Sequence, residues 1–233
     1  MSTPPRVDSP LFFLDYDGTL APIVDDPDAA YPHPDVPAVV QALRERYPLW
    51  IITGRDLRSL GRLFPANVPA IGLHGAQYGT TDTAEPPSFN DETVEALSQM
   101  QANVPSVEGL HLEAKPPTFA VHYRKAHDAD DARRRLQAWV DTAPDFLEAI
   151  WGKKVVELRH QDHTKGRAVR EVADEHPGRT PVYLGDDVTD EDAFNALADY
   201  DACTVKVGPG DTAADYRLDN VEDVVDYLKR YID

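Results

Sequence analysis

Short apolar runs alternate with amphipathic stretches in the first third of the chain. The runs at 11–14, 49–52 and 70–73 are typical of strands that are buried on both faces of a parallel sheet. Apolar residues recur every three or four positions over 37–47 and again over 57–63, which predicts a helix after each of the first two strands. This strand-helix alternation indicates a Rossmann-like, doubly wound parallel α/β sheet.

The same alternation returns in the last third of the chain. Thr164 is in position to cap a helix with its hydroxyl group. After that helix we expect strands at 182–184 and 202–207, a helix at 189–198 between them, and a terminal helix that carries an apolar stripe from Val221 to Ile232. The two end portions therefore belong to one α/β core.

The middle of the chain has a different pattern. Residues 81–92 are polar with two prolines and resemble a linker. The segments that follow are a helix near 94–97, strands at 110–114 and 119–124, a helix at 128–140, and a hairpin of 146–151 and 155–159 around Gly152 and Lys153. The order αββαββ predicts a small antiparallel α+β module. We expect it at 81–160, inserted between core portions at 1–80 and 161–233.

Composition and charge exclude several classes of protein. A chain of 233 residues with 42% hydrophobic content can bury a large core. It contains no run of about 18 apolar residues, and its opening lacks the apolar region of a signal peptide, so we expect a cytoplasmic protein. A net charge of -18 disfavours nucleic acid and anionic membranes as partners. We expect a monomer, and we expect the single cysteine, Cys203, to be a buried structural thiol.

Two carboxylates follow the first predicted strand, in the sequence LFFLDYDGTL. Asp15 ends the strand and Asp17 lies in the loop, at the sheet edge where α/β proteins bind ligands. Such a pair can hold Mg²⁺ and supply one nucleophile and one acid/base group. The alternative is a solvated turn, since Asp, Gly and Thr are common turn residues.

Three further polar stretches are predicted at the same edge. They are Thr53-Gly54-Arg55, Lys165, and Gly185-Asp186-Asp187. Carboxylates can bind a hard cation, while a hydroxyl, a backbone amide and an ammonium group can hold phosphate oxygens. Together these are the groups that phosphoryl transfer requires. Taken singly, Thr53 could cap a helix and the run GDDVTDEDAF could be an acidic helix start.

These motifs carry a family resemblance. DYDGTL, the Thr in ITGR, Lys165 and GDD resemble, in order, the four motifs of the haloacid dehalogenase (HAD) superfamily. The inserted module resembles that superfamily's type C2B cap. GDDVTDEDAF, LHGAQ, HYR at 122–124, and the ExK pattern at Glu113 and Lys115 are similar to trehalose-6-phosphate phosphatases. The GDDxTDEDAF string also occurs in phosphatase-like domains fused to trehalose phosphate synthases.

The resemblance implies a mechanism that uses Mg²⁺ and an aspartyl phosphate. Asp15 would be the nucleophile and Asp17 the acid/base, with Thr53 and Lys165 on the phosphoryl oxygens. The implied ligands of Mg²⁺ are the Asp15 carboxylate, the Asp17 backbone carbonyl and Asp186, and the implied groups that orient water on the metal are Asp187 and Asp190. The substrate would be trehalose 6-phosphate.

The sugar would be recognised by polar residues of the module and of the core edge. The candidates are His74, Glu113, Lys115, Arg124 and Glu157, and Gly54 and Arg55 are further candidates for binding the substrate. The alternative for the module residues is the solvent face of a small sheet. Other readings of the function are a sucrose-phosphate or mannosyl-3-phosphoglycerate phosphatase with the same cap type, a phosphomutase, and a catalytically silent regulatory module. The intact Asp15, Asp17, Lys165 and Asp186 favour an enzyme over the last of these.

Overall fold

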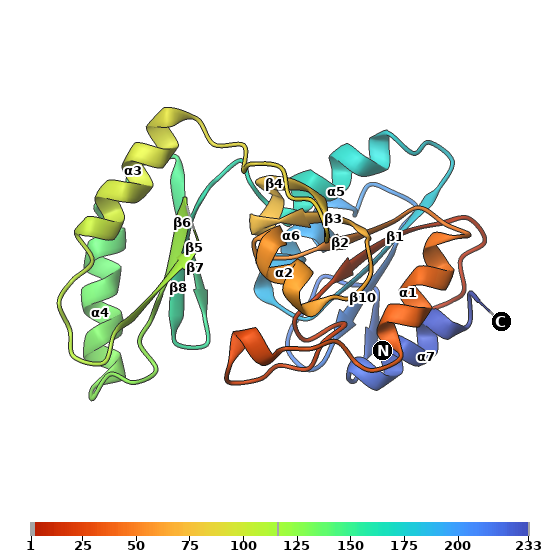
Figure 1. Cartoon of the computed structure of the whole chain (residues 1–233), viewed down its shortest axis with the longest axis horizontal. Helices are drawn as coiled ribbons and strands as arrows, with labels where there is room; N and C mark the ends of the chain where they lie inside the picture. The colour runs from red at the N-terminus through yellow and green to blue at the C-terminus, as the bar shows by residue number, and fades with distance from the viewer. Residues whose placement is uncertain (1–2, 116, 233) are drawn as a thin grey trace. The chain divides into compact units, whose positions relative to one another are not determined.

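The computed structural model of the protein describes residues 3–115 and 117–232, except the side chain of Lys115. It divides the chain into two compact units (Figure 1). The core unit consists of the residues up to Pro86 and those from Thr164 onward, and the inserted unit is Pro87–His163. Each unit has its own sheet and its own hydrophobic core.

A seven-stranded sheet forms the centre of the core unit. Its strand order is β11-β10-β9-β1-β2-β3-β4, and every neighbouring pair is parallel except β3 and β4. The strands are β1 (Pro10–Asp15), β2 (Leu49–Ile52), β3 (Pro69–Gly72), β4 (Gln77–Thr80), β9 (Thr180–Gly185), β10 (Cys203–Val207) and β11 (Tyr216–Leu218). In β1, Phe13 lies opposite Trp50 of β2 and Tyr183 of β9, so the strand that ends in Asp15 is central.

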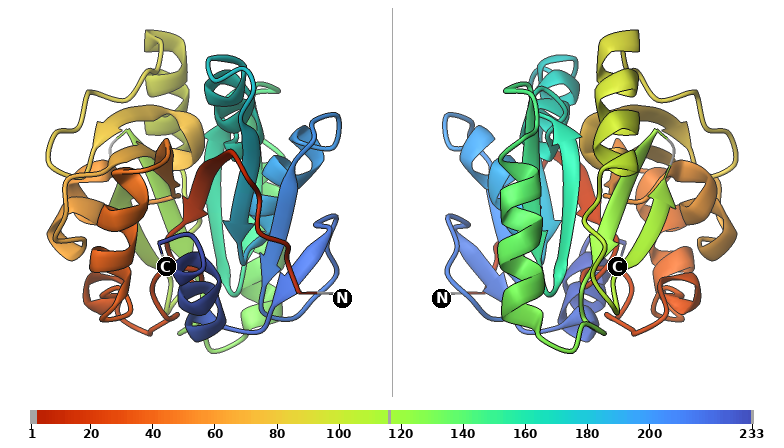
Figure 2. Two further views of the ribbon diagram at one scale, coloured as in Figure 1. Left: turned by 90° about the vertical axis from the view of Figure 1, so that its right-hand side faces the viewer. Right: turned by 90° about the vertical axis from the view of Figure 1, so that its left-hand side faces the viewer.

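Helices cover both faces of this sheet (Figure 2). They are α1 (Val36–Arg44), α2 (Leu57–Leu63), α5 (Lys165–Asp174), α6 (Val188–Ala196) and α7 (Val221–Lys229), with short 3-10 helices η1 (Pro27–Ala29) and η2 (Leu73–Gly75). Phe12 and Leu14 pack in one hydrophobic cluster with residues of α1, α2 and α7. Leu11 and Phe13 pack in the other with residues of α5 and α6. Successive side chains of β1 therefore point into two different hydrophobic clusters, one on each face of the sheet. Because both faces are buried, every residue of the run is apolar.

The inserted unit is a four-stranded antiparallel sheet with two helices. Its strand order is β5-β6-β8-β7. The elements are α3 (Asp91–Ala102), β5 (His111–Lys115), β6 (Thr118–His122), α4 (Ala129–Val140), β7 (Leu147–Gly152) and β8 (Val155–His160). Alternate strand residues, such as Phe119, Val121 and Leu158, pack with residues of both helices in a third cluster. The Trp139 indole donates to the Met100 carbonyl at 3.0 Å and links α4 to α3.

The α/β class with a parallel core and a separate antiparallel sheet is confirmed. Two strands are additional to the sequence prediction, β4 and β11. The inserted unit spans 87–163 rather than 81–160, because the chain after β4 turns back on the core sheet: Thr81 N donates to the Val68 carbonyl and Glu85 N to the Tyr78 carbonyl. None of the described helices is long and apolar enough to cross a membrane.

Candidate active site

The carboxyl end of β1 brings Asp15 against Lys165. Lys165 is the first residue of α5, and its helix begins there because the Thr164 hydroxyl accepts a hydrogen bond from Arg167 N at 3.0 Å. The Lys165 ammonium donates to Asp15 Oδ1 at 2.6 Å and to Asp190 Oδ1 at 2.7 Å. Asp15 is 4% exposed and Lys165 2%, so two carboxylates and one ammonium meet away from solvent.

Asp190 is fixed by donors on both of its oxygens. Besides Lys165, the Tyr183 hydroxyl donates to Oδ1 at 2.7 Å, and Asp187 N donates to Oδ2 at 2.9 Å. A Cβ atom on Gly185 would overlap the Asp190 carboxylate, so the chain needs glycine at this point. Asp190, which the resemblance places near water on a metal, is thus occupied in holding Lys165.

Asp15, Asp186 and Asp190 form an acidic cluster at this edge of the sheet. One carboxylate oxygen of each lies within 4.8 Å of the others. Burial and the nearby Asp190 raise the pKa of Asp15 well above its ordinary value, against the opposing effect of Lys165. Burial, Asp190 and Asp187 raise the pKa of Asp186 to about 7. Burial and mutual repulsion therefore both disfavour the charged forms of Asp15 and Asp186 in the absence of a cation.

This donor set fits a hard divalent cation. Asp15 Oδ2 is buried and has no hydrogen-bond partner among the described residues, while Oδ1 is held by Lys165. The cluster offers oxygen from three carboxylates, and Mg²⁺ prefers such oxygen ligands to nitrogen or sulfur. A bound cation would favour the charged form of Asp186, against the burial and the neighbouring carboxylates that raise its pKa.

The loop after Asp17 lies against the same cluster. Gly18 has a φ of +84°, which favours glycine, and a Cβ atom there would overlap the Asp186 carboxylate. The Gly18 amide donates to the Ala21 carbonyl at 2.7 Å and closes the turn. The glycine of the DYDGT motif therefore lets the β1 loop approach Asp186.

The Asp17 carboxylate is paired with Arg55. Arg55 Nε donates to Asp17 Oδ2 at 2.6 Å, and a terminal guanidinium nitrogen donates to Oδ1 at 2.7 Å. The structure thus brings together Asp17 and a residue expected to contact substrate. Asp17 is two residues from Asp15 in the sequence, but its carboxylate is engaged by Arg55.

Thr53, Gly54 and His74 lie together at the ends of β2 and β3. Thr53 is buried, and its hydroxyl accepts from Arg55 N at 3.1 Å. The alternative that Thr53 caps a helix is wrong, because Asp56 is the residue that caps α2. A Cβ atom on Gly54 would lie 2.6 Å from His74 Cε1, so glycine admits the buried imidazole ring. His74 N donates to the Thr53 carbonyl at 3.1 Å.

Two buried polar residues at the site were missed by the sequence analysis. Lys206 of β10 donates to the backbone carbonyl of Asp186 and lies 3.9 Å from Glu191. Tyr183 of β9 binds Asp190. A lone lysine in the apolar run CTVKV was a usable signal for the first, whereas nothing separates Tyr183 from an ordinary core tyrosine in the sequence.

The remaining candidates belong to the inserted unit. Glu113 Oε2 lies 2.7 Å from His122 Nε2. Glu113 and Glu157 both lie opposite Ala120 in register, so they share the face of the sheet that is turned away from the helices. An Arg124 guanidinium nitrogen donates to the Lys153 carbonyl at 3.5 Å. The side chain of Lys115 lies outside the described part of the structure.

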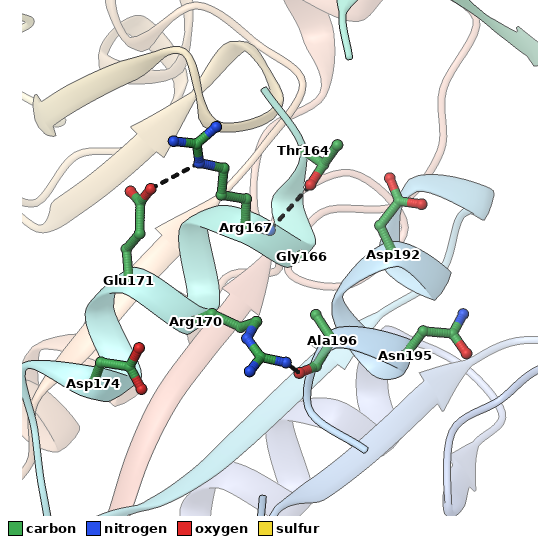
Figure 3. A pocket seen from close by; sticks show the side chains of 9 residues that line it. All are labelled: Thr164, Gly166, Arg167, Arg170, Glu171, Asp174, Asp192, Asn195 and Ala196. Atoms are coloured by element: carbon green, nitrogen blue, oxygen red, sulfur yellow. Dashed lines mark hydrogen bonds and ion pairs between the residues drawn. The ribbon is translucent and has the colours of Figure 1, made fainter. Parts of the chain in front are cut away.

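A surface groove of about 600 Å³ lies between α5 and α6 (Figure 3). Arg167 donates to Glu171 at 3.0 Å, and Arg170 donates to the Ala196 carbonyl at 3.0 Å (Figure 3). Both arginines therefore form hydrogen bonds with other residues that line the groove. Although Lys165 and Asp190 are on the same two helices, neither lines the groove. The groove is therefore separate from the acidic cluster.

Comparisons with known proteins converge on one family. The family model described as trehalose-phosphatase matches residues 13–222. A trehalose-phosphate phosphatase of Mycobacterium marinum is 38% identical over 82% of this chain and 52% of its own, so the chain spans about half of that relative. A trehalose-6-phosphate phosphatase of Escherichia coli K12 is 34% identical over 94% of this chain and 85% of its own.

Solved structures agree with the sequence relatives. The C-terminal domain of a trehalose-6-phosphate phosphatase from C. albicans is 27% identical with a TM-score of 0.79, and the alignment covers 96% of this chain and 92% of that one. A haloacid dehalogenase-like hydrolase from B. subtilis, 14% identical over 94% of this chain and 98% of its own with a TM-score of 0.61, shares the fold. With the family model matching nearly the whole length and both units present, the chain belongs to the trehalose-phosphatase family.

Proposed function

We propose that this protein is a Mg²⁺-dependent phosphatase that hydrolyses trehalose 6-phosphate to trehalose and inorganic phosphate. The observation that carries the proposal is the buried contact of Lys165 with Asp15, which leaves Asp15 Oδ2 without a partner among the described residues. Similarity to relatives named as trehalose-phosphate phosphatases supports the substrate. The face of the inserted unit's sheet that carries Glu113 and Glu157 is the proposed place for the sugar.

Asp15 is the proposed nucleophile. Lys165 holds Oδ1, so Oδ2 is the oxygen available to form a bond to phosphorus while the bond from phosphorus to the sugar oxygen breaks. Asp17 gives a proton to the departing sugar oxygen. Water then bonds to phosphorus, the Asp15–phosphate bond breaks, and Asp17 takes the proton that the water loses. The cycle consumes one water and restores both carboxyl groups.

The remaining core residues are proposed to bind the phosphoryl oxygens and the metal ion. Thr53 and Lys165 are the proposed contacts of the phosphoryl oxygens, together with the Gly54 backbone. The proposed holders of Mg²⁺ are Asp15, Asp186 and the Asp17 backbone carbonyl, and when bound the ion shields the phosphate from the acidic cluster. Lys206 steadies the Asp186 segment through its backbone carbonyl.

In the inserted unit we propose that the polar face around Glu113 binds sugar hydroxyls. Carboxylates accept hydrogen bonds from hydroxyl groups, and a disaccharide offers many of them. Glu157 and Arg124 are further candidates, as is Lys115. Trehalose 6-phosphate carries no charge apart from its phosphate group, so the specificity of this face must come from hydrogen-bond geometry.

The test is phosphate release from trehalose 6-phosphate, glucose 6-phosphate and sucrose 6-phosphate, each with Mg²⁺ and with a chelator. We expect release from trehalose 6-phosphate to be the fastest and to require Mg²⁺. Asp15→Asn should remove turnover while the protein stays folded, and Asp199→Asn on the surface should leave turnover unchanged. Faster release from another sugar phosphate would show that trehalose 6-phosphate is not the preferred substrate. Wild-type rates in Asp15→Asn would refute the mechanism. Binding of the sugar phosphate without any release would indicate a silent regulatory module.

A further inference from the structure

We propose that Arg55 is a positioning residue for Asp17, and that it sets the orientation from which Asp17 exchanges its proton. The inference rests on the phosphatase function proposed above. It replaces the sequence-based expectation that Arg55 contacts the substrate. It starts from the paired contact of the two side chains and from the way in which Arg55 itself is anchored.

The contact between the two side chains fixes an angle as well as a distance. Arg55 Nε binds Asp17 Oδ2 at 2.6 Å, and the second nitrogen binds Oδ1 at 2.7 Å. Two parallel bonds between a planar guanidinium and a planar carboxylate prevent rotation of the carboxylate about its own axis. The Arg55 side chain is 13% exposed and that of Asp17 33%, so the pair is partly shielded from water on the arginine side.

Arg55 is held at both ends, which makes it a rigid support. Its guanidinium carbon lies 5.7 Å from the ring centroid of Tyr16, and the fully buried Tyr16 donates its hydroxyl proton to the Ala30 carbonyl at 2.8 Å. The Arg55 amide donates to Thr53 Oγ1 at 3.1 Å, and its carbonyl accepts from Leu73 N at 2.9 Å. The backbone of Arg55 is therefore fixed by residues that follow β2 and begin η2, and its side chain holds the Asp17 carboxylate in one orientation.

The pair suits both proton transfers. As a carboxylate with both oxygens aligned, Asp17 accepts the proton that water loses when the water oxygen bonds to phosphorus and the Asp15–phosphate bond breaks. Once protonated on one oxygen, Asp17 keeps the arginine bond on the other. It then donates that proton to the next sugar oxygen as the phosphorus–oxygen bond breaks. Arg55 holds Asp17 through both steps without touching the phosphoryl group.

A positioning role and a substrate contact differ in their kinetics. Loss of a substrate contact weakens binding and raises KM. Loss of positioning lowers kcat and leaves KM nearly unchanged. The effect also depends on the leaving group, because p-nitrophenolate departs without a proton whereas a sugar alkoxide needs one. With p-nitrophenyl phosphate, the first step should therefore survive the loss of Arg55 while hydrolysis of the phosphoenzyme slows.

The experiment compares wild type with Arg55→Ala and Arg55→Lys, and uses Arg58→Lys, an exposed arginine of α2, as the matched control. On trehalose 6-phosphate we expect Arg55→Ala to lower kcat by about 10²-fold with KM within about twofold, in line with the loss of acid–base catalysis. On p-nitrophenyl phosphate we expect a rapid burst of p-nitrophenol followed by slow turnover. Added ethylguanidinium should restore part of kcat in Arg55→Ala alone.

A double variant tests whether Arg55 acts through Asp17. In an Asp17→Asn background, Arg55→Ala should cause little further loss of steady-state turnover with p-nitrophenyl phosphate, because the group it positions has already been removed. Independent, multiplicative losses would overturn the inference, as would a KM raised tenfold or more with kcat retained. The melting temperature shows whether Arg55→Ala folds. If it does not, Arg55→Lys is used, because lysine keeps the charge but cannot form the two parallel bonds. A lower kcat with an unchanged KM in Arg55→Lys supports the inference, and a raised KM with an unchanged kcat overturns it.

The proposed function and this inference fail in different ways. A wild-type protein that releases phosphate from neither ester contradicts the function itself. An active wild type whose Arg55 variants change only KM leaves the function intact and returns Arg55 to the substrate site.

Discussion

The hydroxyl group of Tyr183 donates a 2.7 Å hydrogen bond to Asp190 Oδ1, the same oxygen that receives the ammonium of Lys165. The tyrosine is fully buried, and its ring packs against Phe13 and Phe194. Burial and the neighbouring Asp190 raise the pKa of Tyr183 well above its ordinary value, so its hydroxyl stays a donor. A core tyrosine thus helps to aim the lysine at Asp15.

Removal of this hydroxyl should reduce activity while the ring keeps its packing. We expect Tyr183→Phe to lower kcat severalfold and the free energy of unfolding by roughly 1–2 kcal/mol, because one buried hydrogen bond to a charged acceptor is lost. The measurements are steady-state kinetics and urea unfolding. Tyr200→Phe is the matched control, since its hydroxyl binds Asp174 on the surface. Equal effects in the two variants would deny Tyr183 any special role at the site.

Lys165 balances two buried carboxylates, so its removal should be costly for folding. We expect Lys165→Met to lower the free energy of unfolding by roughly 3–5 kcal/mol, the usual effect of leaving a buried charge unpaired. Adding Asp190→Asn to it should recover part of that loss, because one of the two stranded charges is then neutral. Urea unfolding at pH 8 measures both variants. Additive losses in the double variant would contradict this electrostatic account.

The metal-free protein should be stabilised by Asp186→Asn above neutral pH. The pKa of Asp186 is raised from 3.8 to about 7 in the folded protein, mainly by burial. The folded state then binds a proton that the unfolded chain has lost, so this contribution to stability is complete below about pH 4 and is lost as the pH rises through 7. An asparagine does not titrate, so the melting temperature of the variant should exceed that of wild type by a growing margin between pH 4 and 7.

That margin should be constant above pH 8 and amount to roughly 10 °C, because the rise of the Asp186 pKa from 3.8 to about 7 corresponds to about 4 kcal/mol and each kcal/mol to about 2–4 °C in a chain of this size. Added Mg²⁺ should raise the melting temperature of wild type but not of Asp186→Asn. Asp199→Asn, on the surface, should follow wild type at every pH. A margin that does not change with pH would show that the titration of Asp186 is not its source.

Glu113 tests the proposed sugar face of the inserted unit. We expect Glu113→Gln to raise KM for trehalose 6-phosphate about tenfold and to leave that for p-nitrophenyl phosphate unchanged, since only the first substrate has sugar hydroxyls to bind. Glu108→Gln, an exposed glutamate before the same strand, serves as the control. Equal losses on both substrates would exclude Glu113 from sugar recognition.

Much of the core could be predicted because its strands are buried on both faces. Continuous apolar runs marked β1, β2 and β9, and polar residues at their carboxyl ends marked the edge where Asp15, Lys165 and Asp186 meet. The expectation that Cys203 is buried is confirmed, and burial raises the pKa of its thiol to about 11.

The strand β4 could not be predicted, because QYGT contains no apolar run. Its position depends on tertiary contacts: Gln77 Oε1 accepts from Leu57 N at 2.8 Å, and Gln77 Nε2 donates to the Glu85 carbonyl at 2.9 Å. The partner of Arg55 was missed for a similar reason. Asp17 is 38 positions away in the chain, and sequence spacing alone gives no indication that the two side chains meet.

The inserted unit is continuous in sequence, from Pro87 to His163, and the described residues of its hydrophobic cluster include none from the core unit. The two clusters of the core unit likewise contain no residue of the insertion. Among the described residues, exchange of this one segment for that of a relative would therefore remove no side chain from the two hydrophobic clusters of the core unit. Under the proposed function, sugar selectivity could thus be changed separately from the reaction at phosphorus, by replacing one continuous segment of the chain.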